Sequence, residues 1–428
     1  MNSTKLLHAQ GWALGSTSAL RSAATRRPAA HCAKTAAATR AAPTGWAQIR
    51  HKSGPYGYTQ AKSLVYSKYG EPRDVLKLHS HSISPSFPQS TVLLRTLASS
   101  INPADVNTIQ GTYGVKPTFS PLIGTTEPSV IPGNEAVFEV VGVSSSNLKV
   151  QRGDWVIPAK TGFGTWRTHA LAAESDVLKV NKDGGSSSGG GTLKPTQVAT
   201  SFVNPCSAYR MLRDFAEPTL REGDWFIQNG ANSGVGRAAI QLGKLWGYRS
   251  INVVRSRDTP EKTQELKDEL TALGATQVVT EEEFLGREFK DMVAQWTCGS
   301  REGIKLGMNC VGGKSAQTIA KTLGPGGAVV TYGGMSRQPV ALPTGLLIFK
   351  NIRFLGFWLS RWADQDVQAK ERTVNEILDL VREGKFKDGP TVEVPWNWET
   401  EEGVLRDAVQ GTLEGFRAGK GVFVFGET

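Results

Sequence analysis

The chain has 428 residues, of which 39% are hydrophobic and 21% are charged. This composition is typical of a globular protein with room for two domains. No apolar run reaches the roughly 18 residues that a membrane-spanning helix needs, so we expect no membrane insertion. The net charge of +10 would suit a nucleic-acid binder, but seven basic residues fall within the first fifty positions.

The leader, residues 1–53, is rich in Ala, Ser, Thr and Arg, and the first acidic residue of the chain is Glu71. This pattern predicts a mitochondrial transit peptide and a protein of the mitochondrial matrix. The alternative is a basic tail that stays attached. Loss of the seven early charges would lower the net charge from +10 to +3, so we expect no nucleic-acid partner.

Four cysteines, Cys32, Cys206, Cys298 and Cys310, are too dispersed for a C-x-x-C metal or redox motif. Cys32 lies in the leader. We expect the other three to be buried and reduced, as is usual in a matrix protein.

Residues 54–200 contain short strand-like runs that Gly and Pro interrupt, which predicts a twisted β-barrel domain. The expected strands cover residues 91–96, 136–143, 154–157 and 175–180. Eight consecutive residues, 184–191, are Gly or Ser and predict a flexible surface loop. We favour an insertion within the domain over a linker between domains.

A strand, a glycine-rich turn, a helix and a second strand follow one another between residues 224 and 257. The apolar run 226–228 predicts a buried parallel strand, and residues 250–254 predict the next. Gly230, Gly234 and Gly236 between them allow backbone N–H groups to approach a pyrophosphate at a helix N-terminus. The unit predicts a dinucleotide site, although the spacing departs from G-x-G-x-x-G.

Two arginines follow the second strand, at Arg255 and Arg257 on either side of Ser256. In a dinucleotide fold an acidic residue here binds the ribose 2′-OH of NAD, whereas arginine accepts the 2′-phosphate of NADP. The pair therefore predicts NADPH as the cofactor. A solvated strand end is the alternative.

Helical and strand patterns alternate from residue 201 to 362, which predicts a parallel sheet with right-handed crossovers. After residue 363 the chain is expected to pack back on the first domain. The further expected elements are helices at 261–273 and 371–384, and strands at 277–280, 306–311, 328–332, 354–359 and 421–425.

Seven motifs resemble those of known enzymes. Four of them, at 102–105, 153–156, 232–236 and 331–334, resemble the medium-chain dehydrogenase/reductase superfamily. The other three resemble the mitochondrial enoyl-[acyl-carrier-protein] reductases, also called trans-2-enoyl-CoA reductases, and read QGTYG at 110–114, NPCSAYRM at 204–211 and GFWLS at 356–360.

This resemblance implies an α/β fold with a GroES-like β-barrel catalytic domain, residues 54–200, and a Rossmann doubly wound parallel-sheet domain, residues 201–362. Residues 363–428 would complete the catalytic domain. The implied reaction is NADPH-dependent reduction of a trans-2-enoyl thioester on acyl carrier protein or coenzyme A, in mitochondrial fatty acid synthesis. The resemblance also implies a homodimer, with an edge strand at 346–359.

Many relatives in the superfamily are zinc enzymes, with Cys and His ligands in the segment that here reads 101–107 and in a Gly-His-Glu motif. This chain has neither Cys nor His in that segment and has Asn134 before Glu135. Since catalytic zinc prefers Cys and His, we expect no metal. His79 and His81 could share a strand face, but an exposed pair is favoured over a metal site.

Without a metal, reduction of an enoyl thioester needs a neutral proton donor for the α-carbon. A tyrosine, with an ordinary pKa of about 10, stays protonated at matrix pH. The resemblance places this proton donor at Tyr113.

The resemblance assigns the remaining cofactor contacts to both halves of the chain. Asn204 could instead be a turn residue before Pro205, Trp358 a core aromatic and Lys420 a solvated surface residue. The implied contacts are Asn204, Asn232, Ser233, Gly234, Val235, Arg255, Ser256, Arg257, Tyr332, Gly333, Gly334, Met335, Phe357, Trp358, Leu359, Ser360 and Lys420.

Two other functions remain open at this point. A zinc-free NADPH quinone oxidoreductase would use the same scaffold without protonating an α-carbon. A non-catalytic protein that retains a cofactor fold could instead bind nucleic acid. The acyl chain length, the natural carrier and the transit-peptide cleavage site do not follow from the sequence.

Overall fold

The computed structural model describes residues 55–121, 123–183, 191–300, 303–413, 418–426 and 428. The expected transit peptide, residues 1–53, lies outside these described residues, as do residues 184–190 of the Gly/Ser stretch. Among the helices that are described, none is long and apolar enough to cross a lipid bilayer.

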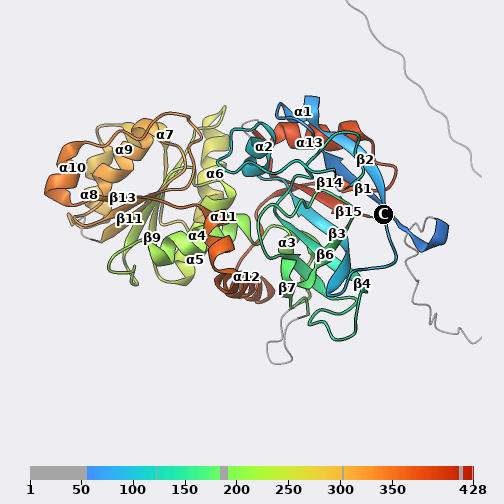
Figure 1. Cartoon of the computed structure of the whole chain (residues 1–428). Helices are drawn as coiled ribbons and strands as arrows, with labels where there is room; N and C mark the ends of the chain where they lie inside the picture. The colour runs from blue at the N-terminus through green and yellow to red at the C-terminus, as the bar shows by residue number, and fades with distance from the viewer. Residues whose placement is uncertain (1–54, 122, 184–190, 301–302, 414–417, 427) are drawn as a thin grey trace, which may run out of the picture. The chain divides into compact units, whose positions relative to one another are not determined.

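One sheet has six parallel strands in the order β10-β9-β8-β11-β12-β13. Figure 1 labels three of them, β9, β11 and β13. The strands are β8 (Trp225–Gln228), β9 (Arg249–Val254), β10 (Gln277–Thr280), β11 (Ile304–Asn309), β12 (Ala328–Thr331) and β13 (Arg353–Gly356). The order reverses between β8 and β11, and ligands of such sheets bind beyond the carboxyl ends of the strands at this point.

Helices connect these parallel strands, because a parallel pair needs a crossover. They are α5 (Gly234–Leu245), α6 (Pro260–Leu273), α7 (Glu281–Leu285), α8 (Phe289–Trp296), α9 (Gly313–Thr322) and α10 (Thr344–Lys350).

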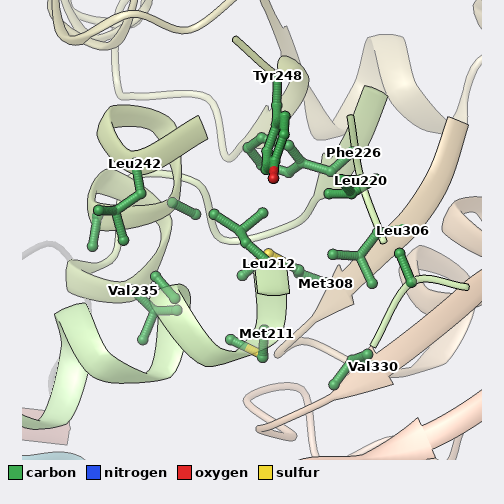
Figure 2. Packing of buried hydrophobic residues seen from close by; sticks show 14 of the residues in the cluster. Met211, Leu212, Leu220, Phe226, Val235, Leu242, Tyr248, Leu306, Met308 and Val330 are labelled. Atoms are coloured by element: carbon green, nitrogen blue, oxygen red, sulfur yellow. The ribbon is translucent and has the colours of Figure 1, made fainter. Parts of the chain in front are cut away.

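Alternate residues of β8 enter two separate cores on the two faces of the sheet. Phe226 packs in a cluster with Met211 of α4 (Val203–Asp214) and Leu242 of α5 (Figure 2). Ile227 packs on the opposite face with Phe284 and other apolar residues. Burial on both faces explains why β8 lacks the alternation of apolar and polar residues that a strand with one exposed face has.

A second sheet has the order β14-β15-β3-β4-β5-β7, and β6 also pairs with β3. Its strands are β3 (Thr91–Ser100), β4 (Ala136–Val143), β5 (Trp155–Pro158), β6 (His169–Ala173), β7 (Val177–Val180), β14 (Thr391–Trp396) and β15 (Lys420–Phe425). β15 pairs antiparallel with β3, so the last part of the chain completes a sheet that the first part begins.

The remaining elements surround this second sheet or connect the two. β1 (Thr59–Val65) and β2 (Lys77–Ile83) form an antiparallel pair. The others are α1 (Pro72–Val75), α2 (Pro103–Ile109), α3 (Pro195–Val198), α11 (Leu359–Gln365), α12 (Val367–Arg382), α13 (Glu402–Gln410) and the 3-10 turns η1 (Pro55–Gly57), η2 (Glu174–Asp176) and η3 (Gly411–Leu413).

Two expected strands are partly wrong. The expected strand 175–180 begins as the turn η2, where the Asp176 carboxylate accepts the backbone N–H of Ala173 at 3.3 Å. The expected strand 354–359 ends at Gly356 and gives way to α11 at Leu359. The apolar residues after Gly356 read as a strand, but they leave the sheet.

The expected edge strand 346–359 is also wrong over its first part. Residues Thr344–Lys350 form α10, which Asn351 ends in the left-handed conformation, with φ 49° and ψ 41°. Only β13 is a strand, and it does lie at the sheet edge. The prediction of three buried cysteines holds for Cys206 and Cys310, but Cys298 is exposed.

Candidate active site

A cavity of about 1640 Å³ is lined by residues of β14 and β15 in the second sheet and by helices and loops that adjoin both sheets. Apart from Arg255 and Ser256, every residue that the sequence proposed for the site lines it. The cavity therefore brings together residues that lie more than three hundred positions apart in the chain, such as Tyr113 and Lys420.

The glycine-rich turn after β8 forms one end of the cavity. Ser233 caps α5, and its hydroxyl accepts the backbone N–H of Gly236 at 3.1 Å. A Cβ atom on Gly236 would lie 2.4 Å from the carbonyl oxygen of Ala231, so this position admits no side chain. The turn presents the N-terminus of α5 to the cavity, an arrangement that binds phosphate in dinucleotide folds.

Asn204 packs directly against this turn. It lies inside α4, so the alternative of a turn residue before Pro205 is wrong. A Cβ atom on Gly234 would lie 2.4 Å from the Asn204 side-chain nitrogen. This close approach joins α4 to the start of α5.

The three residues after β9 lie in different surroundings. Arg257 is half-buried on the cavity wall, and burial, then the nearby Arg255, lower the pKa of its guanidinium. Arg255 is exposed and does not line the cavity. The hydroxyl of Ser256 donates a hydrogen bond to the Glu282 carboxylate at 2.7 Å. Of the three, only Arg257 offers a cation to the cavity.

Two segments that follow strands of the same sheet form another wall. After β12 they are Tyr332, Gly333, Gly334 and Met335, and after β13 they are Phe357, Trp358, Leu359 and Ser360. Met335 is 64% exposed and Trp358 is 38% exposed. The alternative of Trp358 as a core aromatic is therefore wrong.

Tyr113 lies opposite Trp358, in the loop that follows α2. The indole N–H of Trp358 donates to the hydroxyl oxygen of Tyr113 at 2.8 Å. The two rings meet edge to face, with centroids 5.9 Å apart and an angle of 82°. Because an indole N–H can only donate, the phenol oxygen accepts, and its own proton points elsewhere.

Tyr66 also lines the cavity, but it differs from Tyr113 in exposure. Its side chain is 1% exposed, and burial, with a contribution from Tyr69, raises the pKa of its hydroxyl. Tyr113 is half-buried, so its hydroxyl is the more accessible proton donor of the two.

Glu135 is a buried carboxylate whose two oxygens are fully used. One accepts the Lys420 ammonium at 2.8 Å, the Asn102 amide at 3.0 Å and the Ser100 hydroxyl. The other accepts the backbone N–H groups of Phe202 at 3.0 Å and Val203 at 2.7 Å. Lys420 is thus half of an ion pair, and the alternative of a solvated surface lysine is wrong.

Burial alone would raise the pKa of Glu135, but Lys420 and the other donors outweigh it and hold the pKa below its ordinary value. The carboxylate stays ionised with an ammonium where a zinc enzyme of this superfamily has a ligand segment. Among the described residues, no three His, Cys, Asp or Glu side chains gather as a metal site. This donor set does not fit zinc.

Asp105 lies beside this ion pair and is 1% exposed. It accepts the backbone N–H of Asn102 at 2.9 Å and the side-chain amide of Asn134 at 2.8 Å. Burial raises its pKa to about 6, although both hydrogen bonds act in the opposite direction. The carboxyl group anchors the first turn of α2, the helix that leads to Tyr113.

The expectation of an exposed pair at His79 and His81 is wrong, because both side chains are half-buried. Their rings stack with centroids 5.8 Å apart, and a His79 ring nitrogen lies 2.8 Å from the Ile123 carbonyl oxygen. Burial, then His79 and Arg167, lower the pKa of His81 to about 4.

Several cavity residues escaped the sequence reasoning. Asp105 lies within the superfamily motif at 102–105, and Asn134 lies at the position of an absent zinc ligand. The capping pattern that begins at Asn102 is the signal in the sequence that points to Asp105. Thr161, Gly162 and Phe163 carried no signal of their own, because they line the cavity from an irregular loop.

Comparisons with known proteins agree with this geometry. Residues 88–184 match the alcohol dehydrogenase GroES-like domain, and residues 234–379 match the zinc-binding dehydrogenase family. The fold and the cavity define a member of the medium-chain dehydrogenase/reductase class, with a GroES-like domain and a Rossmann-type sheet. The zinc of the second family's name does not fit the residues around Glu135.

Relatives within that class are close. The chain is 46% identical over 330 residues to the mitochondrial enoyl-[acyl-carrier-protein] reductase of Yarrowia lipolytica, which covers 77% of this chain and 82% of that protein. It is 41% identical over 341 residues to the human enzyme of the same name, covering 78% and 83%. This chain belongs to the mitochondrial enoyl-[acyl-carrier-protein] reductases, and the expected mitochondrial location is confirmed.

Solved structures show the same similarity. The Etr1p/NADP/crotonyl-CoA complex matches with a TM-score of 0.79 and 40% identity over 85% of this chain and 99% of that chain. A putative NADPH:quinone reductase from Bacillus thuringiensis matches with a TM-score of 0.68 but only 22% identity over 85% and 99%. The second match shows a shared fold alone.

Proposed function

We propose that this protein reduces the double bond of trans-2-enoyl thioesters, carried on acyl carrier protein or coenzyme A, with NADPH. Its closest functional support is membership of the mitochondrial enoyl-[acyl-carrier-protein] reductases, together with its similarity to Etr1p, a structure solved with NADP and crotonyl-CoA. The chemistry fits a role in mitochondrial fatty acid synthesis. For the quinone alternative, the similarity to a putative NADPH:quinone reductase at 22% identity supports only the fold.

The residues of the cavity fit NADPH. The turn at 232–235 and the N-terminus of α5 would hold the pyrophosphate, and Arg257 would contact the 2′-phosphate. The segments 332–335 and 357–360, with Asn204 and Lys420, would follow the rest of the cofactor. When bound, NADPH supplies the hydride that is added to the β-carbon.

Charge then develops on the thioester oxygen, and the α-carbon needs a proton. Tyr113 is the proposed donor, and its contact with Trp358 is the single observation that carries this role. The indole N–H fixes the phenol oxygen as an acceptor, so the phenol proton is directed away from Trp358. Proton transfer from a positioned side chain typically contributes a rate factor of about 10² to 10⁴.

A steady-state comparison tests the proposal. Purified protein should oxidise NADPH with crotonyl-CoA and with longer enoyl-CoA substrates. It should oxidise NADH more slowly with the same substrates, and it should oxidise NADPH more slowly when a quinone is the acceptor. Turnover of a quinone that exceeds turnover of every enoyl thioester would favour the alternative function.

We further propose that the protein forms a homodimer through β13 and α10. β13 is the edge strand of the six-stranded sheet, and Phe349 is 84% exposed and Ile348 67% exposed on the neighbouring α10. Large apolar side chains beside an unpaired strand edge favour a partner. A relative from Candida tropicalis was solved as an Etr1p/Etr2p heterodimer.

The oligomeric state in light scattering tests this assembly. Phe349→Asp should shift the wild-type dimer toward monomer, and a monomeric wild type would rule the dimer out.

The domain limits are likewise a proposal. Residues 54–200 and 363–428 would form the catalytic domain around the second sheet, and residues 201–362 the NADPH-binding domain. Limited proteolysis near these limits checks them, since cleavage within either sheet would argue against this division.

A further inference from the structure

One wall of the cavity is an irregular loop that continues from the end of β5. Residues 158–163 connect the end of β5 to the segment before β6, and Thr161, Gly162 and Phe163 of this wall segment line the cavity. Gly162 adopts φ +80°. Pro158 still pairs within the sheet, and the Ala159 N–H donates to the Asp176 carbonyl oxygen at 2.8 Å. Beyond Ala159, the position of the wall segment depends on the side chains that bind its backbone.

Four side chains from other parts of the chain form hydrogen bonds with residues 158, 159, 161, 162 and 163 of the wall segment. Lys370 of α12 donates to the carbonyl oxygens of residues 158 at 2.8 Å and 159 at 3.2 Å. Asp364 of α11 accepts the Thr161 backbone N–H at 2.9 Å and its hydroxyl at 2.5 Å. The Asn134 side-chain oxygen accepts the N–H of Gly162 at 2.6 Å, and Arg167 donates to the Phe163 carbonyl at 3.0 Å.

Two of these four come from the helices that directly follow Trp358. Trp358 precedes the first residue of α11, and the same short helix carries Asp364. One end of α11 is thus bonded to Tyr113 through Trp358, and the other end is bonded to Thr161. Lys370 is 1% exposed, and its ammonium lies 3.9 Å from the centre of the Phe202 ring. The buried lysine therefore holds α12 against the wall segment.

We propose that Asp364 is a positioning residue that sets the distance between the wall segment and the Tyr113–Trp358 pair, and thereby selects the acyl chain. The inference rests on the proposed function, because it names the part of the substrate that this wall would meet. A fixed wall favours short chains that fill the chamber. A released wall gives a wider chamber, which weakens the binding of short chains and admits longer ones.

The test compares the Asp364→Ala and Thr161→Val variants with the wild type on crotonyl-CoA and on decenoyl-CoA. In Asp364→Ala the KM for crotonyl-CoA should rise while kcat changes by less than about twofold. The ratio of kcat/KM for decenoyl-CoA to kcat/KM for crotonyl-CoA should rise about fivefold or more, as expected for the loss of hydrogen bonds of ordinary strength. Thr161→Val loses only the hydroxyl bond, so its ratio should rise less. Thr161→Ser keeps the hydroxyl and should restore the wild-type ratio.

Asp407→Ala is the matched control. Asp407 lies on α13, and its exposed carboxylate forms an ion pair with Arg73 at 3.0 Å. Its ratio should equal that of the wild type. The inference is overturned if the kcat/KM ratio of decenoyl-CoA to crotonyl-CoA stays within twofold of the wild type in both Asp364→Ala and Thr161→Val, even where these variants are less stable.

Hydrogen exchange provides a readout that does not depend on activity. The Thr161 amide should exchange faster in Asp364→Ala than in the wild type, and unchanged exchange there also contradicts the positioning role. If the wild type reduces none of the enoyl thioesters, the proposed function fails, and the exchange experiment still decides whether Asp364 holds the wall.

Discussion

Trp358 donates its indole N–H to the hydroxyl of Tyr113 at 2.8 Å, although 245 positions separate the two residues in the chain. The contact joins the loop after α2 to the segment that follows β13. It therefore connects the two sheets at the cavity and fixes which way the phenol proton can point.

Trp358→Phe keeps an aromatic ring but removes the donor to Tyr113. Because one hydrogen bond contributes about 1 kcal/mol, we expect kcat with crotonyl-CoA to fall about fivefold. Trp362→Phe is a suitable control, since Trp362 lies on α11, which begins directly after Trp358, but does not line the cavity. Equal kcat values in the Trp358 variant and the wild type would argue against this orienting role.

Breaking the Glu135–Lys420 pair should destabilise the protein strongly. Lys420→Met leaves a carboxylate buried at 2% exposure without its cation, and such a loss typically costs about 3 to 5 kcal/mol. Thermal or denaturant unfolding measures it. The double variant Glu135→Gln, Lys420→Met should lose less than the sum of the two single losses, and strict additivity would show that the two groups are not coupled.

Asp105 should make stability depend on pH in an unusual direction. Burial raises its folded pKa to about 6, above the unfolded value of about 3.9, so the folded state binds the proton more tightly. The penalty is fully present above about pH 6 and falls as the pH drops toward 4. Relative to Asp105→Asn, the wild type should gain about 1 kcal/mol of unfolding free energy from pH 7 to pH 5.

Urea unfolding of both proteins at several pH values checks this prediction. The difference between them isolates Asp105 from other titrating groups, including His81. A difference that is constant with pH, or that grows toward neutral pH, would contradict the raised pKa.

Arg257→Ala should weaken NADPH binding and leave NADH binding unchanged. A charge-assisted contact to the 2′-phosphate is worth about 1.5 to 3 kcal/mol, so the Kd for NADPH should rise about tenfold or more. Arg255→Ala should have a smaller effect, because Arg255 does not line the cavity. Fluorescence titration with both nucleotides measures the two constants, and an equal loss for NADH would reassign Arg257.

The sequence predicted much of the fold because its apolar patterns follow burial. The strands 136–143 and 277–280 match β4 and β10 at both ends, and α6 begins one residue before the expected helix at 261–273. The pattern failed at 354–359, where apolar residues after Gly356 line a cavity instead of a sheet. A hydrophobic pattern indicates that a residue is shielded from water, but it does not distinguish a residue that packs in a sheet from one that lines a cavity.

The site was predictable only where the chain keeps its parts together. The turn at 232–236 and its helix are contiguous, so their pattern is visible in the sequence. The partners of Glu135 and Thr161 lie 285 and 203 residues away, at Lys420 and Asp364. Nothing local in the sequence links such pairs, because the sheets alone bring them together.

The proton donor is the central claim, and Tyr113→Phe tests it most directly. The substitution keeps the ring against Trp358 and removes only the hydroxyl. With NADPH and crotonyl-CoA, kcat should fall at least about a hundredfold while the Kd for NADPH stays within about twofold of the wild type. A kcat equal to that of the wild type, with NADPH bound as before, would show that Tyr113 does not supply the proton.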